Sequence, residues 1–184
     1  LRAIPNLEVW RPADGIETLE VWQASLQSLN TPSIIALSRQ NLKPVRNKFI
    51  KNNLSALGAY ILVDRDDADI CLYSSGSEIE IAVNAAEKLE LEGIKVRVIS
   101  VPCLDRFYMQ NKEYKDTIIK SIPKIVIEAG VRQSWDYILN ENDIFIGMTS
   151  FGSSAPAKDL YKHFSITEEK VMSSAKLILN RRNT

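Results

Sequence analysis

Two hydrophobic periods alternate near the start of the chain and predict a strand–helix–strand unit. Residues 7–10 alternate apolar and polar side chains, and residues 33–38 carry a short apolar run, as strands do. Between them, residues 15–29 place apolar side chains at helical spacing, namely Ile16, Leu19, Trp22 and Leu26. A single βαβ unit leaves strand edges and apolar faces uncovered. We therefore expect it to be one corner of a larger sheet.

From Leu42 to about Leu57 the pattern lapses into polar and prolyl residues, with no sign of a packed element. This predicts a linker at residues 45–58 between a first unit, residues 1–44, and a second domain, residues 59–184.

In the second domain, strand and helix periods alternate. Strands are predicted at 59–63, 69–74, 95–101, 124–128 and 144–146. The charged turn after the first of them suggests a hairpin with one antiparallel edge, whereas the later crossovers favour parallel pairing. The fold class is therefore α/β, a three-layer sandwich with a mixed, mostly parallel five-stranded sheet, preceded by a partial βαβ unit.

Capping residues predict where the helices begin and end. Ser75 and Glu78 have the spacing of a capping box, and Gly93 suits the left-handed exit of the helix that runs to about Leu91. Near the end of the chain, Ser154 is predicted to cap one helix and Thr167 another.

Composition excludes some classes of function. Among 184 residues, Lys plus Arg and Asp plus Glu are each 23, so no overall field favours nucleic acid. No apolar stretch approaches the roughly 20 residues of a spanning helix, so a membrane partner is not expected. The chain begins at Leu1 in the middle of a domain pattern, which suggests an expression fragment or a proteolytic remnant.

Few residues suggest metal or thiol chemistry. Cys71 and Cys103 have no CxxC spacing and are interpreted as reduced structural cysteines. His163, the only histidine, cannot form a zinc site without other ligands at suitable spacing, and it is placed late in a predicted helix, where its cation would favour the helix dipole. We predict no catalytic, cofactor-binding or metal-binding residue in this chain.

Arg39 is the one candidate binding residue. It follows the predicted strand at 33–38, and its planar fork can donate two parallel hydrogen bonds to phosphate oxygens. A solvated surface arginine is the alternative from position alone. The turn at 74–77 is a second candidate, because amides at a helix start bind anions, although a capping box would already use those donors.

Several short sequence motifs, taken together in their order along the chain, resemble the transketolase family. The first set is similar to the end of its pyrimidine-binding domain and the second to its carboxy-terminal domain. The first set is Arg2-Ala3-Ile4-Pro5-Asn6-Leu7, Trp10-Arg11-Pro12-Ala13-Asp14-Gly15 and Ser38-Arg39-Gln40-Asn41-Leu42. The second is Ser75-Gly76-Ser77-Glu78, Glu128-Ala129-Gly130, Trp135 with Tyr137, and Phe151-Gly152 with Ser154-Ala155-Pro156-Ala157-Lys158.

The resemblance implies a cytoplasmic homodimeric enzyme of the pentose phosphate pathway. Such an enzyme transfers a two-carbon ketol unit from a ketose phosphate to an aldose phosphate, using thiamine diphosphate and Mg²⁺ or Ca²⁺ held by an upstream domain. In this family Arg39 would match the arginine that holds the sugar phosphate, and the chain alone would be inactive. Trp135, Tyr137 and Phe151 would be core or interface aromatics. Dihydroxyacetone synthase and a short non-catalytic binding or assembly module are the alternatives.

Overall fold

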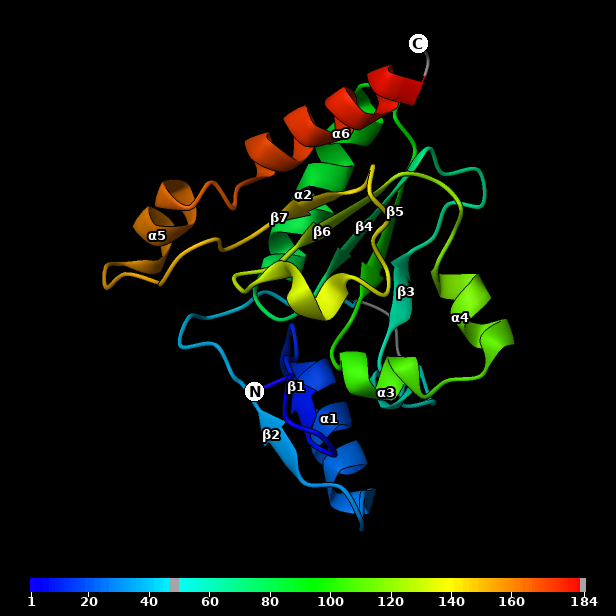
Figure 1. Cartoon of the computed structure of the whole chain (residues 1–184), viewed down its shortest axis with the longest axis vertical. Coiled ribbons are helices and arrows are strands. Elements are labelled where there is room, and N and C mark those ends of the chain that lie inside the picture. Colours follow the sequence, from blue (N-terminus) through cyan, green and yellow to red (C-terminus); the bar gives the residue numbers. More distant parts are fainter. Residues whose placement is uncertain (47–49, 183–184) are drawn as a thin grey trace.

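The computed structural model describes residues 1–46 and 50–182, and its central feature is a five-stranded sheet in the order β3-β5-β4-β6-β7 (Figure 1). The strands of this sheet are β3 (Tyr60–Val63), β4 (Ile70–Ser74), β5 (Val96–Ser100), β6 (Lys124–Ile127) and β7 (Ile144–Ile146). Every neighbouring pair is parallel except β3 and β5, which are antiparallel. The predicted mixed, mostly parallel sheet of five strands is therefore confirmed.

The predicted hairpin between the first two strands of this sheet is wrong. β3 pairs with β5 and not with β4, so β5 lies between them. Electrostatics help to explain the order, since Arg97 on β5 lies 2.6 Å from Asp64 and 3.6 Å from Asp66 in the turn after β3. This turn is thereby attached to β5.

Helices cover both faces of the sheet and make the predicted three layers. They are α2 (Glu78–Leu91) and α6 (Glu168–Arg182) on one face, and α3 (Leu104–Tyr108), α4 (Lys112–Ile118) and the 3-10 helix η2 (Arg132–Trp135) on the other. Alternate residues of each strand enter the two cores, as the pleat requires. On β4, for example, Ile70 and Leu72 pack beneath α2 and α6, whereas Cys71 and Tyr73 face Phe107 and the opposite layer.

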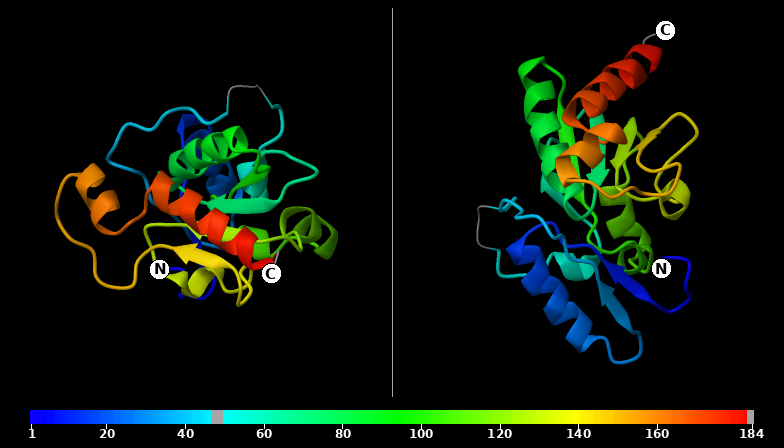
Figure 2. Two further views of the ribbon diagram at one scale, coloured as in Figure 1. Left: turned by 90° about the horizontal axis from the view of Figure 1, so that it is seen from above. Right: turned by 90° about the vertical axis from the view of Figure 1, so that its left-hand side faces the viewer.

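The first unit consists of β1 (Glu8–Trp10), α1 (Gly15–Gln27) and β2 (Ser33–Ile35), and its two strands are parallel. Figure 2 shows it at one end of the five-stranded domain, away from the C-terminus. Asp14 caps α1 by accepting a hydrogen bond from the backbone N–H of Glu17 at 2.8 Å. The βαβ prediction is confirmed, with shorter elements.

Helix α1 buries a face other than its apolar stripe. Its buried apolar residues, Val21 and Ala24, pack with Trp10 and Cys103. The predicted stripe is exposed, by 41% at Ile16, 73% at Leu19, 51% at Trp22 and 74% at Leu26. The expectation that this unit leaves an apolar face uncovered is therefore met in the described part of the chain.

The segment predicted to be a linker contains one short element, the 3-10 helix η1 (Ser55–Leu57). It also packs on α1, since Arg46 lies 2.7 Å from Glu20, whose Oε2 also accepts from the hydroxyl of Ser55 at 2.7 Å. Residues 47–49 of this predicted linker lie outside the described residues.

Of the two caps predicted near the C-terminus, one is confirmed. The Oγ1 of Thr167 accepts from the N–H of Lys170 at 3.3 Å at the start of α6. The preceding helix, α5 (Ala157–His163), begins after Pro156 without a side-chain cap, so the prediction for Ser154 is wrong. At the end of α2, Gly93 has φ +82° as predicted.

Candidate functional site

The five-stranded sheet has a topological switch point at β4. From β4 the chain crosses through α2 to β5 on one side, and it later returns to β6 on the other side of β4. Switch points leave a crevice at the carboxyl ends of the strands, where α/β proteins commonly bind ligands. Ser75 follows β4 and Glu128 follows β6 at this edge. A site is therefore expected at this end of the sheet, in the region between Ser75 and Glu128 that is called the crevice below.

Glu128 lies in this crevice with a side chain only 2% exposed. Its Oε1 accepts hydrogen bonds from Nη2 of Arg2 at 2.6 Å, Nη1 of Arg11 at 2.6 Å and Oγ of Ser75 at 2.8 Å. Its Oε2 accepts from Nη1 of Arg2 and from the indole Nε1 of Trp135, both at 2.6 Å. Burial alone would raise the pKa of Glu128, but Arg2, Arg11 and Trp135 outweigh it and lower the pKa to about 2.

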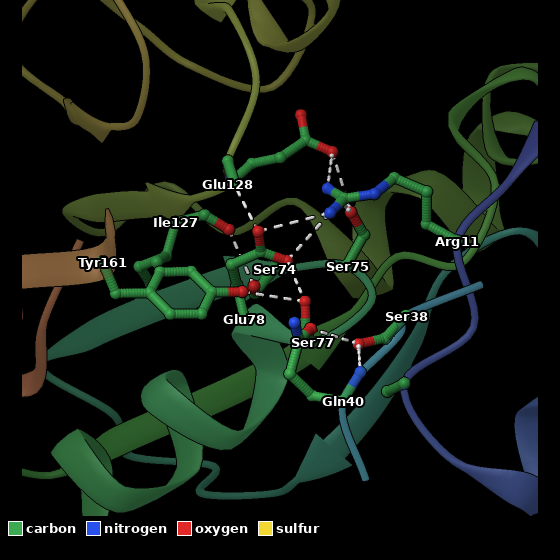
Figure 3. Close-up of polar contacts among 12 residues, drawn as sticks. Arg11, Ser38, Gln40, Ser74, Ser75, Ser77, Glu78, Ile127, Glu128 and Tyr161 are labelled. Carbon is green, nitrogen blue, oxygen red and sulfur yellow. Dashed lines mark hydrogen bonds and ion pairs between the residues drawn. The ribbon is translucent and has the colours of Figure 1, made fainter. Parts of the chain in front are cut away.

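Arg11 joins two buried carboxylates across the crevice. Its Nη1 contacts Glu128, and its Nη2 lies 3.2 and 2.9 Å from the two carboxylate oxygens of Glu78, whose side chain is fully buried (Figure 3). Burial would lower the pKa of Arg11, but the two carboxylates raise it above its ordinary value. The crevice therefore holds a permanent cation supplied by the residue that follows β1.

The backbone of Arg11 is also attached to the five-stranded domain. Its N–H donates to the carbonyl of Pro102 at 2.8 Å, and its carbonyl accepts from the N–H of Gly76 at 2.9 Å. Gly76 has φ +61°, and a Cβ there would lie 3.3 Å from Nη2 of Arg11. Glycine thus provides both the left-handed turn and room for the guanidinium.

The capping box predicted at Ser75 and Glu78 is wrong. Helix α2 begins at Glu78, and Ser77 precedes it without a side-chain capping bond. The hydroxyl of Ser75 donates to Glu128, while Glu78 accepts from Arg11 and from the N–H of Ala129 at 2.9 Å. Charge-assisted hydrogen bonds to a guanidinium are stronger than a neutral cap, which explains the outcome.

An anion at the turn of residues 74–77 is not favoured by this geometry. The N–H of Gly76 is already used by Arg11, and the guanidinium of Arg11 is already paired with the carboxylates of Glu78 and Glu128. The crevice that might have held a phosphate is occupied by a guanidinium of the same chain. It is a junction between the two units of the fold.

Arg39, the predicted phosphate-binding residue, lies outside this junction. Its side chain is exposed, and no hydrogen bond or ion pair involves it within residues 1–46 and 50–182. The loop that carries it is ordered locally, since Ser38 Oγ accepts from the N–H of Gln40 at 3.0 Å and donates to its Oε1 at 2.7 Å. The guanidinium of Arg39 is thus exposed on a loop after β2 whose conformation is held by local hydrogen bonds.

The loop after Arg39 lies against the five-stranded domain. A cavity of about 580 Å³ is lined by Gln40, Asn41 and Leu42 on one side and by residues of α2, α5 and α6 on the other. Lys43 extends this contact, with its Nζ 3.0 Å from Glu80 on α2. The position of Arg39 therefore depends on both units.

Other residues singled out in the sequence lie elsewhere. Cys71 and Cys103 are buried free thiols, and burial raises their pKa values to about 11 and about 12. His163 is the last residue of α5, with its ring 4.8 Å from that of Phe164. Trp135 is fully buried as predicted for a core aromatic, whereas Tyr137 is 57% and Phe151 98% exposed.

The described residues do not suit a divalent metal ion. They contain no group of three or more His, Cys, Asp or Glu side chains able to hold one. The buried carboxylates Glu78 and Glu128 are already neutralised by arginines. Residues 1–46 and 50–182 therefore contain no such donor set for Mg²⁺ or Ca²⁺. In the same part of the chain, no helix is both long and apolar enough to cross a membrane.

Two protein families match the sequence. The transketolase-like TK C-terminal domain matches residues 58–167, and the transketolase pyrimidine binding domain matches residues 1–44. The transketolase of Cereibacter sphaeroides is 47% identical over 176 residues, which cover 96% of this chain and 27% of that protein. The transketolase of Sinorhizobium medicae is 49% identical over 183 residues, covering 98% of this chain and 26% of that protein.

Solved structures show the same relationship. The transketolase of Leishmania mexicana superimposes with a TM-score of 0.90 at 38% identity, covering 98% of this chain and 26% of that one. A Pichia stipitis transketolase in complex with sedoheptulose-7-phosphate also has a TM-score of 0.90, at 36% identity, covering 99% of this chain and 26% of that one. The chain spans about a quarter of the length of these relatives. It belongs to the transketolase family and corresponds to the carboxy-terminal portion of its members, the end of the pyrimidine-binding domain followed by the C-terminal domain.

Proposed function

We propose that this chain supplies the substrate-phosphate-binding arginine, Arg39, of a transketolase that transfers a two-carbon ketol unit from a ketose phosphate to an aldose phosphate. The observation that carries the proposal is the state of Arg39. It is exposed and unpaired within the described residues, on the loop after β2, whereas Arg11, Arg46 and Arg97 are held in ion pairs. A guanidinium in this state can receive a phosphate without first losing a protein partner.

The chemistry of the ligand agrees with this assignment. The guanidinium stays charged at any working pH and can form a bidentate pair with phosphate oxygens. The Pichia stipitis relative whose structure is similar to this chain was solved in complex with sedoheptulose-7-phosphate, a phosphorylated ketose. Binding at the phosphate end of the sugar would orient the substrate without touching the reacting carbons.

We propose that residues 1–44 complete a pyrimidine-binding domain, that 45–58 form the linker and that 59–184 form the C-terminal domain. Thiamine diphosphate and Mg²⁺ or Ca²⁺ would be bound by other parts of a cytoplasmic, homodimeric enzyme, and the chain by itself would not catalyse transfer. The exposed apolar side chains of α1, including Leu19 and Leu26, support contact with such additional parts.

The test is Arg39→Ala in the native polypeptide that carries this chain. Loss of a charged hydrogen bond should weaken the apparent binding of phosphorylated ketoses by about 1.5 to 3 kcal/mol, which is measured as a rise in KM. The KM for unphosphorylated ketoses should change much less. Arg65→Ala is the matched control, because Arg65 is a half-exposed arginine whose guanidinium hydrogen-bonds to Asp64 and Glu90 of the C-terminal domain. An equal loss for both substrate types would refute the role of Arg39, and absence of transfer by the unmodified polypeptide would favour a binding or assembly module.

A further inference from the structure

We infer that Arg11, together with Glu78 and Glu128, positions Arg39, so that the C-terminal domain determines how well the enzyme binds the substrate phosphate. The inference rests on the proposed role of Arg39 in phosphate binding. Arg11 and the two glutamates would act as positioning residues, because they reach the substrate only through the strands of the first unit.

The first step is the attachment of Arg11 to the C-terminal domain. Its guanidinium spans Ser75, Glu78 and Glu128, and its backbone N–H and carbonyl are bonded to Pro102 and Gly76. Five hydrogen-bonding groups of the C-terminal domain therefore converge on one residue. Because Arg11 directly follows β1, these contacts fix the carboxyl end of that strand.

The second step leads from β1 to β2. The two strands are paired in parallel, with Trp10 opposite Ile35. The last hydrogen bond of the pair runs from the N–H of Ala36 to the carbonyl of Trp10, at 2.8 Å. Arg11 is thus the next residue after the acceptor, and Arg39 lies on the loop that begins after the donor.

The third step is that β2 has few other supports. Its three residues are only half-buried, and β1 is its sole strand partner in the described part of the chain. Displacement of the end of β1 would therefore displace Ala36 and the start of the Arg39 loop. The first unit has further contacts with the C-terminal domain. Glu17 holds α1 through Tyr60 and Ser100, Arg106 and Asp105 contact the first two residues of β1, and Lys43 beyond the Arg39 loop pairs with Glu80. Arg11 is the contact at the carboxyl end of β1, next to the hydrogen bond that holds Ala36.

The contacts of Arg11 and those of Glu17 can thus be tested separately by mutation. Removal of the Tyr60 hydroxyl weakens the attachment of α1, at a hydrogen bond of 2.7 Å to Glu17, and leaves the contacts of Arg11 in place. Tyr60→Phe is therefore an interface control. Glu90→Gln is a remote control, because Glu90 pairs with Arg65 on the surface of the C-terminal domain.

The experiment compares Arg11→Gln, Arg11→Lys and Ser75→Ala with these controls in the native polypeptide. Amide hydrogen exchange is measured for peptides covering residues 33–40 and 96–101, and KM and kcat are measured with phosphorylated and unphosphorylated ketoses. In Arg11→Gln we expect exchange in the first peptide to rise by about tenfold, with little change in the second. KM for the phosphorylated ketose should rise severalfold, while kcat and KM for the unphosphorylated ketose stay near their original values.

Graded variants keep the inference testable if Arg11→Gln does not fold. Lysine keeps the charge but cannot span both carboxylates, so Arg11→Lys should show a smaller effect in the same direction. Ser75→Ala removes only one hydroxyl from the cluster and should show the smallest effect.

Two results would overturn the inference. One is unchanged exchange at residues 33–40 in every folded variant of Arg11 and Ser75. The other is the same change in Tyr60→Phe, which would mean that any weakening of the interface suffices. The exchange measurement needs no substrate, so it tests the coupling even if Arg39→Ala shows that Arg39 does not bind phosphate.

Discussion

The indole of Trp135 and the carboxylate of Glu128 are joined by a hydrogen bond in which Nε1–H donates to Oε2 at 2.6 Å. Both side chains are buried, and the same carboxylate accepts hydrogen bonds from Arg2, Arg11 and Ser75. Trp135 thus combines two roles, since its ring fills the core beneath the sheet and its N–H helps to stabilise a buried charge.

Trp135→Phe should separate these roles. The variant keeps most of the buried ring but removes the donor to Glu128, so the free energy of unfolding should fall by about 1.5 to 3 kcal/mol, as for a hydrogen bond to a charged group. Urea unfolding followed by circular dichroism measures the change. The control is Trp22→Phe, because Trp22 is 51% exposed. Equal stability losses in the two variants would contradict the importance of this hydrogen bond.

Glu128 should also contribute to stability in a defined pH window. Its folded-state pKa is lowered from 4.5 to about 2, so its contribution is present above the unfolded-state pKa and is lost as pH falls toward 2. Over the whole window the loss corresponds to about 3 kcal/mol. The free energy of unfolding, measured by urea titration between pH 6 and pH 3, should fall more steeply in the unmodified chain than in Glu128→Gln. Parallel curves would show that Glu128 titrates equally in both states.

Glycines with the same backbone conformation should differ in their tolerance of alanine. Gly58 and Gly93 have φ +83° and +82°, but a Cβ at Gly58 would lie 2.2 Å from the backbone N of Phe107, whereas nothing lies within 4 Å at Gly93. In Gly93→Ala the free energy of unfolding should therefore fall only by the cost of a left-handed alanine, about 1 to 2 kcal/mol. In Gly58→Ala the free energy of unfolding, measured by chemical denaturation, should fall clearly more, because α3 must also move. Similar losses would mean that the backbone near Phe107 adapts without penalty.

Much of the fold could be predicted from hydrophobic periods because each element carries its own pattern. The run at Ile70–Ser74 is apolar on both faces and proved to be a central strand between β5 and β6. The spacing in α2 and the glycine at 93 gave that helix its correct end. Strand order was less predictable, because the position of β5 between β3 and β4 depends on pairing across the sheet and on Arg97 with its acidic turn.

The junction around Glu128 was not predicted, and the reason is physical. Arg2, Arg11, Glu78 and Glu128 lie far apart in the sequence, and no local period indicates that their side chains meet. Local spacing instead predicted a capping box between Ser75 and Glu78. In the structure both side chains hydrogen-bond to the guanidinium of Arg11, which is distant in the sequence. The only available signal was that these residues lie within the words that resemble transketolase. The apolar stripe of α1 was predicted from its spacing, but the spacing does not show that Val21 and Ala24 supply the face that packs on Trp10.

The most direct test of the central claim is the intact mass and activity of the native polypeptide that carries this sequence, captured with an antibody raised against residues 59–184. The account predicts a polypeptide several times longer than this chain, with ketol transfer between sugar phosphates that depends on thiamine diphosphate. A native product near 20.8 kDa without such transfer would contradict the assignment to a transketolase enzyme.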